Sequence, residues 1–149
     1  MALITGVFLF IAVCGQAQSA YIKKYCDLAD SLSQVYGIPA SVILGVAIIE
    51  SSSGKSRNCK LLNNHFGIVG KNNLLKTKGI KTRYKQYPNA KASFVDFCKV
   101  IARKKFYSNL EGNTDYKLWV DAISKTGYST LPALWKKNVS NAIIRNKLS

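Results

Sequence analysis

Glu50 is the residue whose position in the sequence is best suited to acid–base chemistry. It ends an apolar run from Val42 to Ile49 and is followed by three serines and a glycine. The run predicts a helix that begins near Pro39 and is apolar on nearly all sides, as helices at the centre of a domain are. The negative end of the helix dipole and the surrounding hydrocarbon both disfavour a charged carboxylate, so we expect a raised pKa for Glu50. A glutamate that simply turns to water at a helix end is the alternative that this stretch leaves open.

Two loops further along the chain carry groups that bind sugars. The stretch NNHFGI places the amides of Asn63 and Asn64 next to the ring of Phe66 and a glycine. Amides hydrogen-bond sugar hydroxyl and acetamido groups, an aromatic face can stack on a pyranose ring, and glycine allows close backbone approach. The stretch GYSTLP adds the hydroxyl of Tyr128. Taken singly, each loop also reads as ordinary capping and turn structure.

The charge balance is strongly basic. The 149 residues include 22 Lys and Arg against 7 Asp and Glu, a formal net charge of +15, which attracts polyanions such as nucleic acid, anionic lipid or an acidic wall polymer. Five of the cations alternate along one segment: Lys76, Lys78, Lys81, Arg83 and Lys85. They are expected either to attract an anionic substrate or to keep an edge strand from aggregating.

The first 20 residues predict a signal peptide. They carry no charged side chain, their apolar core from Leu3 to Val13 is too short to span a bilayer comfortably, and small residues follow it. Cleavage is expected near Ala17 to Ala20, with a lipid anchor at Cys14 or a retained helix as alternatives. Three cysteines then remain, Cys26, Cys59 and Cys98, which we expect to be core thiols. With His65 as the only histidine, neither a disulfide framework nor a metal site is expected.

The remaining residues predict one mainly α (α+β) domain over 21–149. Apolar residues at helical spacing predict helices over 21–36, 39–50, 92–103, 115–126 and 132–147. Residues 51–70 are expected to be irregular. Residues 67–88 predict a small β-hairpin, with a turn at Asn72-Asn73 or Lys78-Gly79.

Four ordered motifs together resemble the glucosaminidase family of bacterial peptidoglycan hydrolases. They are ESSSGKS (50–56), NNHFGIV (63–69), YPNAKASFVDF (87–97) and GYSTLP (127–132). The family is of the mannosyl-glycoprotein endo-beta-N-acetylglucosaminidase type, glycoside hydrolase family 73, and includes flagellar muramidase-like and autolysin domains. The resemblance implies a lysozyme-like fold with a small β-hairpin beside the cleft. It also implies an exported monomer, in the periplasm, cell envelope or medium, that needs no cofactor and binds no nucleic acid. Its expected substrate is the β-1,4 bond after N-acetylglucosamine in peptidoglycan glycan strands.

The resemblance assigns roles to five residues. Glu50 matches the catalytic acid, and Tyr128 matches a tyrosine near the acetamido group of the sugar. Asn63, Asn64 and Phe66 match the loop that borders the substrate. Asp96 also falls on a family position, but its place in a helical segment favours a structural role.

This chain departs from the family pattern in three places. Ser52 and Ser53 replace a glycine and a tryptophan, so an apolar wall beside Glu50 is either lost or supplied elsewhere, and Leu131 replaces an aspartate. No acid lies between Glu50 and Asp96, so the second carboxylate that some members carry on the hairpin is missing. Substrate assistance by the acetamido group is the expected mechanism. A transglycosylase or muramidase acting through one acid, and a non-catalytic cationic wall-binding module, are the alternatives.

Overall fold

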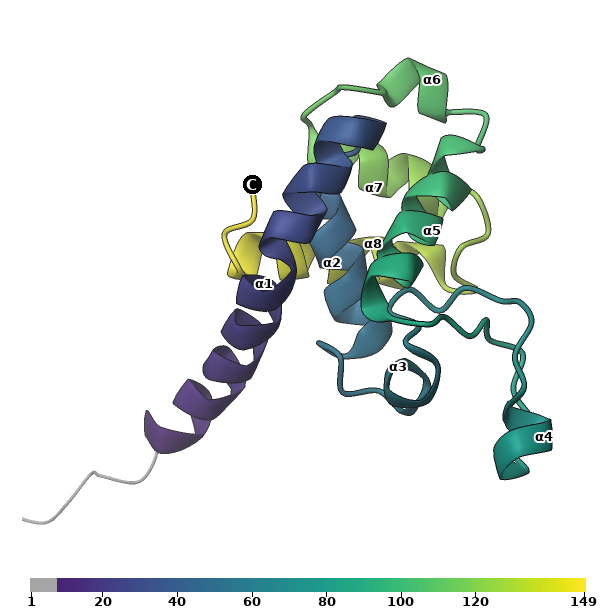
Figure 1. The fold of residues 1–149 in the computed structure, drawn as a ribbon. Coiled ribbons are helices and arrows are strands. Elements are labelled where there is room, and N and C mark those ends of the chain that lie inside the picture. Colours follow the sequence, from purple (N-terminus) through teal and green to yellow (C-terminus); the bar gives the residue numbers. More distant parts are fainter. Residues whose placement is uncertain (1–7) are drawn as a thin grey trace, which may run out of the picture.

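The structure is a computed structural model that describes residues 8–149, and their side chains from Ala20 onward. It is mainly helical, as expected, and Figure 1 shows the helices gathered around α2. The elements are α1 (Phe8–Tyr36), α2 (Ala40–Ser51), α3 (Arg57–Leu62), α4 (Leu74–Lys78), α5 (Ala90–Ala102), α6 (Tyr107–Leu110), α7 (Tyr116–Ser124) and α8 (Pro132–Arg145).

The five expected helices are present. Four of them have ends shifted by at most two residues, whereas α1 begins at Phe8, 13 residues before its expected start. The short helices α3, α4 and α6 were not expected, and α3 falls in a segment predicted to be irregular. Residues 1–7 of the expected signal peptide lie outside the described residues, and α1 runs without a break through position 20. Over the described residues, no helix combines the length and the apolar character needed to cross a bilayer.

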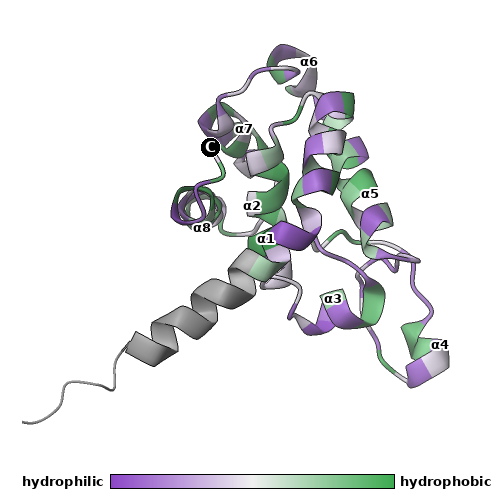
Figure 2. Cartoon of the chain, turned by 60° about the vertical axis from the view of Figure 1, so that its left-hand side comes forward, coloured by the Kyte–Doolittle hydropathy of each residue, from purple (hydrophilic) through white to green (hydrophobic). Residues whose placement is uncertain are grey.

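Helix α2 is the centre of the core. Every residue from Ser41 to Ile48 is buried, and the helix packs against α1, α7 and α8. Gly45 lets α8 approach closely, because a Cβ atom there would lie 2.7 Å from a side-chain carbon of Ile143. Figure 2 shows hydrophobic residues along α2 and hydrophilic ones on the outer surfaces of the surrounding helices. The buried helix therefore fixes the position of its last turn, which carries Glu50.

The predicted β-hairpin is not confirmed as a pair of regular strands. Residues 68–86, here called the arm, run out from the helices and back, with α4 at the tip in place of a tight turn (Figure 1). One isolated antiparallel bridge joins Val69 to Tyr84, and the amide of Lys85 donates to the carbonyl of Ile68 at 2.8 Å. The side-chain amide of Asn72 donates to the carbonyls of Thr82 and Tyr84, each at 2.9 Å. Side-chain bonds of this kind replace part of the ladder that a hairpin would have.

The three cysteines whose side chains the structure describes are free thiols. Cys59 and Cys98 are buried and Cys26 is half-buried. Among the same residues, no group of His, Cys, Asp and Glu is arranged to hold a metal ion.

Candidate active site

Glu50 lies half-buried in the last turn of α2, between α8 and the loop that follows α3. Its Oε1 accepts a hydrogen bond of 2.7 Å from the indole Nε1–H of Trp135. Its Oε2 faces Gly67, where a Cβ atom would lie only 3.0 Å away. One carboxylate oxygen is thus bonded to Trp135 and the other lies close to Gly67, both more than fifteen positions away in the sequence.

The surroundings of Glu50 favour its protonated form. Burial raises the pKa of Glu50 above its ordinary value, in the direction expected for an acid at the end of an apolar helix, and the bond from Trp135 lowers it in part. The carboxyl group therefore keeps its proton, and can act as an acid, up to a higher pH than a glutamate in water. The anion that remains already has a hydrogen-bond donor in place.

Trp135 is the site residue that the sequence did not reveal. In the sequence it is one of the apolar residues at helical spacing over 132–147, and it is 5% exposed. Pro132 begins α8, and the turn that follows directs the indole toward α2. Its ring supplies an apolar wall beside Glu50, which Ser52 and Ser53 do not provide. The available signal was chemical, since a buried indole N–H needs an acceptor.

Replacing Trp135 by phenylalanine is expected to raise the pKa of Glu50 further. The indole N–H stabilises the charged carboxylate, so its loss favours the protonated form. The alkaline limb of the pH–rate profile, where Glu50 loses its proton, should move to higher pH, and the maximal rate should fall. The profile of kcat/KM from pH 4 to 9 measures this, and a limb that stays in place or moves down would contradict it.

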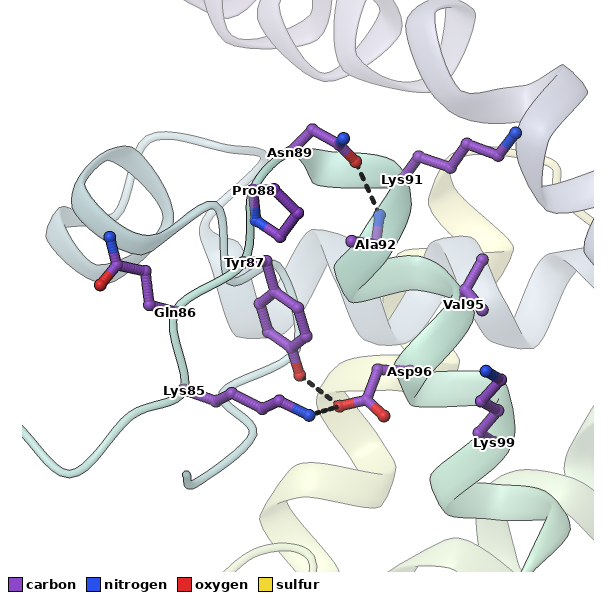
Figure 3. Close-up of a pocket in the computed structure, with 10 residues that line it drawn as sticks. All are labelled: Lys85, Gln86, Tyr87, Pro88, Asn89, Lys91, Ala92, Val95, Asp96 and Lys99. Carbon is purple, nitrogen blue, oxygen red and sulfur yellow. Dashed lines mark hydrogen bonds and ion pairs between the residues drawn. The ribbon is translucent and has the colours of Figure 1, made fainter. Parts of the chain in front are cut away.

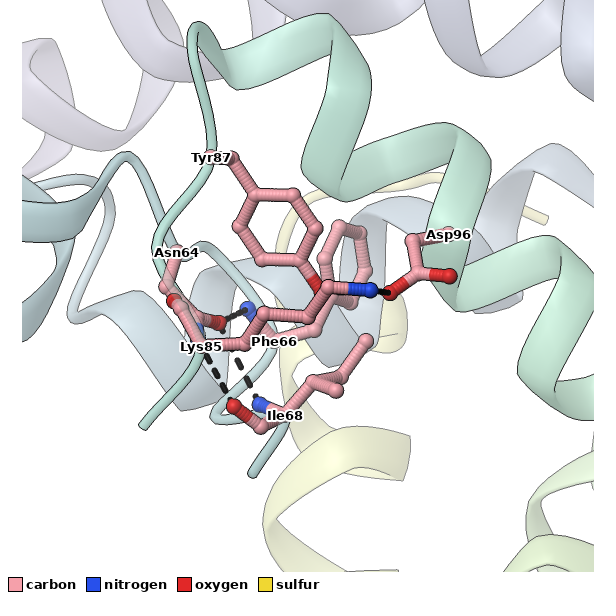
Figure 4. Close-up of polar contacts among 6 residues, drawn as sticks. All are labelled: Asn64, Phe66, Ile68, Lys85, Tyr87 and Asp96. Carbon is pink, nitrogen blue, oxygen red and sulfur yellow. Dashed lines mark hydrogen bonds and ion pairs between the residues drawn. The ribbon is translucent and has the colours of Figure 1, made fainter. Parts of the chain in front are cut away.

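The loop 63–67 is held rigidly by its own amides. The side chain of Asn64 is buried and donates to the carbonyls of Ile68 and Lys85, each at 2.9 Å (Figure 4). Its Oδ1 accepts from the backbone amides of Phe66 and Ile68. Asn63 caps α3 in a left-handed conformation and donates to the carbonyl of Tyr87 at 3.1 Å. Asn64 is fully occupied with the backbone, so its side chain has no capacity left for a sugar hydroxyl.

Phe66 lies in the core and not on a cleft wall. It is 0% exposed and stacks on Phe97 with ring centroids 4.3 Å apart. The ring therefore has no free face for a pyranose, which corrects the stacking role expected from the sequence. The sequence alone could not decide this, because a phenylalanine in a short loop with asparagines and a glycine can either pack in the core or line a cleft.

The carbonyl of Phe66, in contrast, belongs to the site. It accepts a hydrogen bond of 2.6 Å from the hydroxyl of Tyr128. Burial, and then the charges of Glu50 and Tyr87, raise the pKa of Tyr128 well above its ordinary value, so the hydroxyl keeps its proton. The ring of Tyr128 packs on Trp135 at a centroid distance of 5.4 Å. The structure thus brings Glu50 and Tyr128 together around Trp135.

Asp96 lies in a different cluster. Its Oδ2 accepts from Lys85 Nζ and from the hydroxyl of Tyr87, both at 2.7 Å. Burial acts to raise the pKa of Asp96, but these two bonds outweigh it and hold the pKa below its ordinary value. The charged carboxylate ties the base of the arm to α5, in agreement with the structural role expected for it.

A second buried polar cluster supports both sides of the Glu50 site. The hydroxyl of Tyr21 in α1 lies 2.6 Å from Nδ1 of His65 and 3.3 Å from Oγ of Ser51. Burial, and then the charge of Lys24, lower the pKa of His65 to about 4, so its ring is neutral and shares one proton of a hydrogen bond with the hydroxyl of Tyr21. Tyr21 therefore links the residue after Glu50 to the loop that holds Gly67.

The chain is similar to known proteins in sequence and in fold. The family model described as "Glucosaminidase: Mannosyl-glycoprotein endo-beta-N-acetylglucosaminidase" matches residues 26–148. No curated protein sequence matches the chain.

Among solved structures, the catalytic domain of the autolysin Auto from Listeria monocytogenes is 23% identical. It has a TM-score of 0.73, with 99% of this chain and 89% of that one covered. The glycoside hydrolase domain of FlgJ from Salmonella typhimurium is 20% identical, with a TM-score of 0.67 and coverages of 87% and 88%. A peptidoglycan hydrolase from Sphingomonas sp. A1 is 22% identical, with a TM-score of 0.67 and coverages of 87% and 89%. At these identities the likeness establishes the fold.

Proposed function

The chain belongs to the glucosaminidase family of glycoside hydrolases, and we propose that it cleaves the β-1,4 bond after N-acetylglucosamine in peptidoglycan, with Glu50 as general acid. The observation that carries the proposal is the Glu50 carboxyl group, held between Trp135 and Gly67 with a raised pKa. Two structures that share the fold are described as a peptidoglycan hydrolase from Sphingomonas sp. A1 and a mutant of it. The basic charge of the chain suits a substrate that carries lactyl and peptide carboxylates.

The first step is proton transfer from Glu50 to the glycosidic oxygen. As the bond breaks, Glu50 becomes a carboxylate, and the indole N–H of Trp135 then donates to a full negative charge. The bond is stronger in that state than in the protonated ground state, so Trp135 stabilises the transition state more than the bound substrate.

The second group is supplied by the substrate itself in this proposal. The sequence contains no acid from 51 to 95, and Asp96 is already bound by Lys85 and Tyr87. The acetamido carbonyl oxygen of N-acetylglucosamine attacks the anomeric carbon as the bond to the leaving sugar breaks, which forms a cyclic oxazolinium. Glu50 then takes a proton from water as that water opens the ring. Two displacements at one carbon predict retained configuration.

Tyr128 is proposed to position the acetamido group. Its hydroxyl donates a hydrogen bond to the carbonyl of Phe66, so its oxygen can accept a hydrogen bond from the N–H of the acetamido group. An accepted N–H makes the carbonyl oxygen of the same amide more electron-rich and a better nucleophile.

Replacing Tyr128 by phenylalanine is expected to lower kcat roughly 10- to 100-fold, as loss of one well-placed hydrogen bond at a reacting group does. It also leaves the carbonyl of Phe66 without its partner, which should cost about 1–3 kcal/mol of unfolding free energy. Steady-state kinetics and denaturant unfolding measure the two effects. An unchanged kcat in a folded variant would remove Tyr128 from the mechanism.

A lytic transglycosylase is the second candidate, because such an enzyme works with a single acid and this site has one.

The simplest test of hydrolysis uses peptidoglycan purified from several sources. The wild-type protein must generate new reducing ends with time. Failure on every source would reject the proposed activity in favour of a transglycosylase, if anhydromuramyl ends appear, or of a wall-binding module, if no new ends appear.

The proposed place of action is the cell envelope or the medium, reached through the signal peptide at residues 1–20. Tyr21 is buried and bonded to His65, so the folded domain needs the chain from Tyr21 onward. Cleavage near Ala17 to Ala20 keeps Tyr21. Amino-terminal sequencing and the intact mass of the exported chain test this, and a start after Tyr21 or a lipid on Cys14 would contradict it.

A further inference from the structure

A hollow of about 500 Å³ opens at the base of the arm (Figure 3). One wall is the face of α5 that carries Lys91, Val95 and Lys99, and the other is the segment directly after the arm, with Tyr87 and Pro88. The hollow combines apolar walls with ammonium groups, which is the composition of a site for a small anionic ligand with apolar parts.

The charge of the hollow is not cancelled by its one acid. Asp96 is already bound to Lys85 and Tyr87. Lys91 and Lys99 make no ion pair with any acid of the described residues. They lie eight positions apart on one face of α5, which places their Cα atoms about 12 Å apart. Lys91 also occupies the first turn of α5, where a positive charge opposes the helix dipole, so it does not serve the stability of the helix.

The hollow and the Glu50 site share one aromatic cluster. Phe97, next to Asp96 in α5, stacks on Phe66 and packs edge-on against Tyr128 at a centroid distance of 6.2 Å. The hollow and the Glu50 site therefore lie against the same packed aromatic cluster.

We propose that this hollow binds the carboxylate-bearing peptide of the same glycan strand whose sugar bond lies at Glu50. The inference rests on the proposed function and adds the substrate class to it. A lactyl-linked peptide with small apolar side chains offers methyl groups to Tyr87, Pro88 and Val95. Its free carboxylates pair with the ammonium groups of Lys91 and Lys99. A neutral sugar ring would leave both ammonium groups without a partner.

The test compares Lys91→Gln/Lys99→Gln with the wild type on two soluble substrates made from the same phosphate-free glycan strands. One retains its peptides, and the other has been stripped of them by an amidase. On peptide-bearing strands we expect the double variant to lose roughly three- to tenfold in kcat/KM, the size of two partly exposed ion pairs. On stripped strands we expect a change of less than about twofold, because those pairs cannot form.

A matched control removes the same charge elsewhere. Lys105→Gln/Lys117→Gln takes two exposed lysines from the α5–α6 link and from α7, and it should affect both substrates equally. Peptide-bearing strands whose carboxylates have been amidated should behave like stripped strands. Equal losses on all substrates, or no loss on any, would overturn the proposal.

The same assay separates failure of this inference from failure of the proposed function. Wild-type protein that releases reducing ends from stripped strands retains the proposed activity, whatever the lysine variants do. If wild-type protein releases none from either substrate, the proposed function fails, and the peptide site fails with it.

Discussion

Replacing Glu50 by glutamine is expected to lower the hydrolysis of peptidoglycan by roughly 100- to 10,000-fold, the usual contribution of a general acid. Glutamine has the same shape, and its amide oxygen can still accept from the indole of Trp135. What it lacks is an acidic proton for the leaving oxygen. The rate at which reducing ends appear from purified peptidoglycan, with equal concentrations of both proteins, measures the effect.

The control for this variant is its stability. The raised pKa of Glu50 determines whether the substitution stabilises or destabilises the folded protein at a given pH. A folded-state pKa above the unfolded one gives a stabilising contribution that is full below the unfolded pKa and is lost as the pH rises through the folded pKa. Glutamine does not titrate, so Glu50→Gln should be at least as stable as the wild type at pH 8, and sacculus binding should be unchanged. A stable variant that hydrolyses at more than a tenth of the wild-type rate would contradict the role of Glu50.

Replacing Gly67 by alanine is expected to lower activity on the order of 100-fold, because a displacement of a catalytic group by about 1 Å can have that effect. The added Cβ atom would lie 3.0 Å from Oε2 of Glu50 and push the carboxyl group away from its position against Trp135. Gly67 also has a φ of 65°, so alanine should cost about 1–2 kcal/mol of unfolding free energy through backbone strain. Kinetics on peptidoglycan and thermal unfolding measure the two effects.

Gly79 offers a control that isolates the contact with Glu50. Its φ is 66°, almost the same as that of Gly67, but a Cβ atom there would meet nothing within 4 Å. Gly79→Ala should therefore lose similar stability and keep its activity. If both variants lose activity to the same extent, strain and not displacement of Glu50 is the cause, and the close approach of Gly67 has no catalytic meaning.

The position of Glu50 could be predicted because it depends on local pattern. An unbroken apolar run has to be buried, and the residue that ends it has to emerge where the core ends. The partner of Glu50 could not be predicted in the same way. Trp135 lies 85 positions away, and only the packing of α8 across Gly45 decides which acceptor its indole meets.

The loops show the opposite limit of sequence reasoning. Asn64 and Phe66 lie in a stretch whose composition suits sugar binding, but composition does not say which atoms face the cleft. The side chain of Asn64 turns inward to hold Ile68 and Lys85, and Phe66 contributes its carbonyl in place of its ring. The prediction of a β-hairpin for the arm was not confirmed for a related reason. The side chain of Asn72 forms hydrogen bonds with the backbone, and α4 replaces the turn.

The most direct test of the central claim is the identity of the new chain ends. Purified peptidoglycan is digested with the wild-type protein, reduced with borohydride and analysed by mass spectrometry after complete cleavage of the remaining strands. The account predicts reduced N-acetylglucosamine at the new ends, and none with Glu50→Gln. Anhydromuramyl ends, or reduced N-acetylmuramic acid, would contradict cleavage after N-acetylglucosamine.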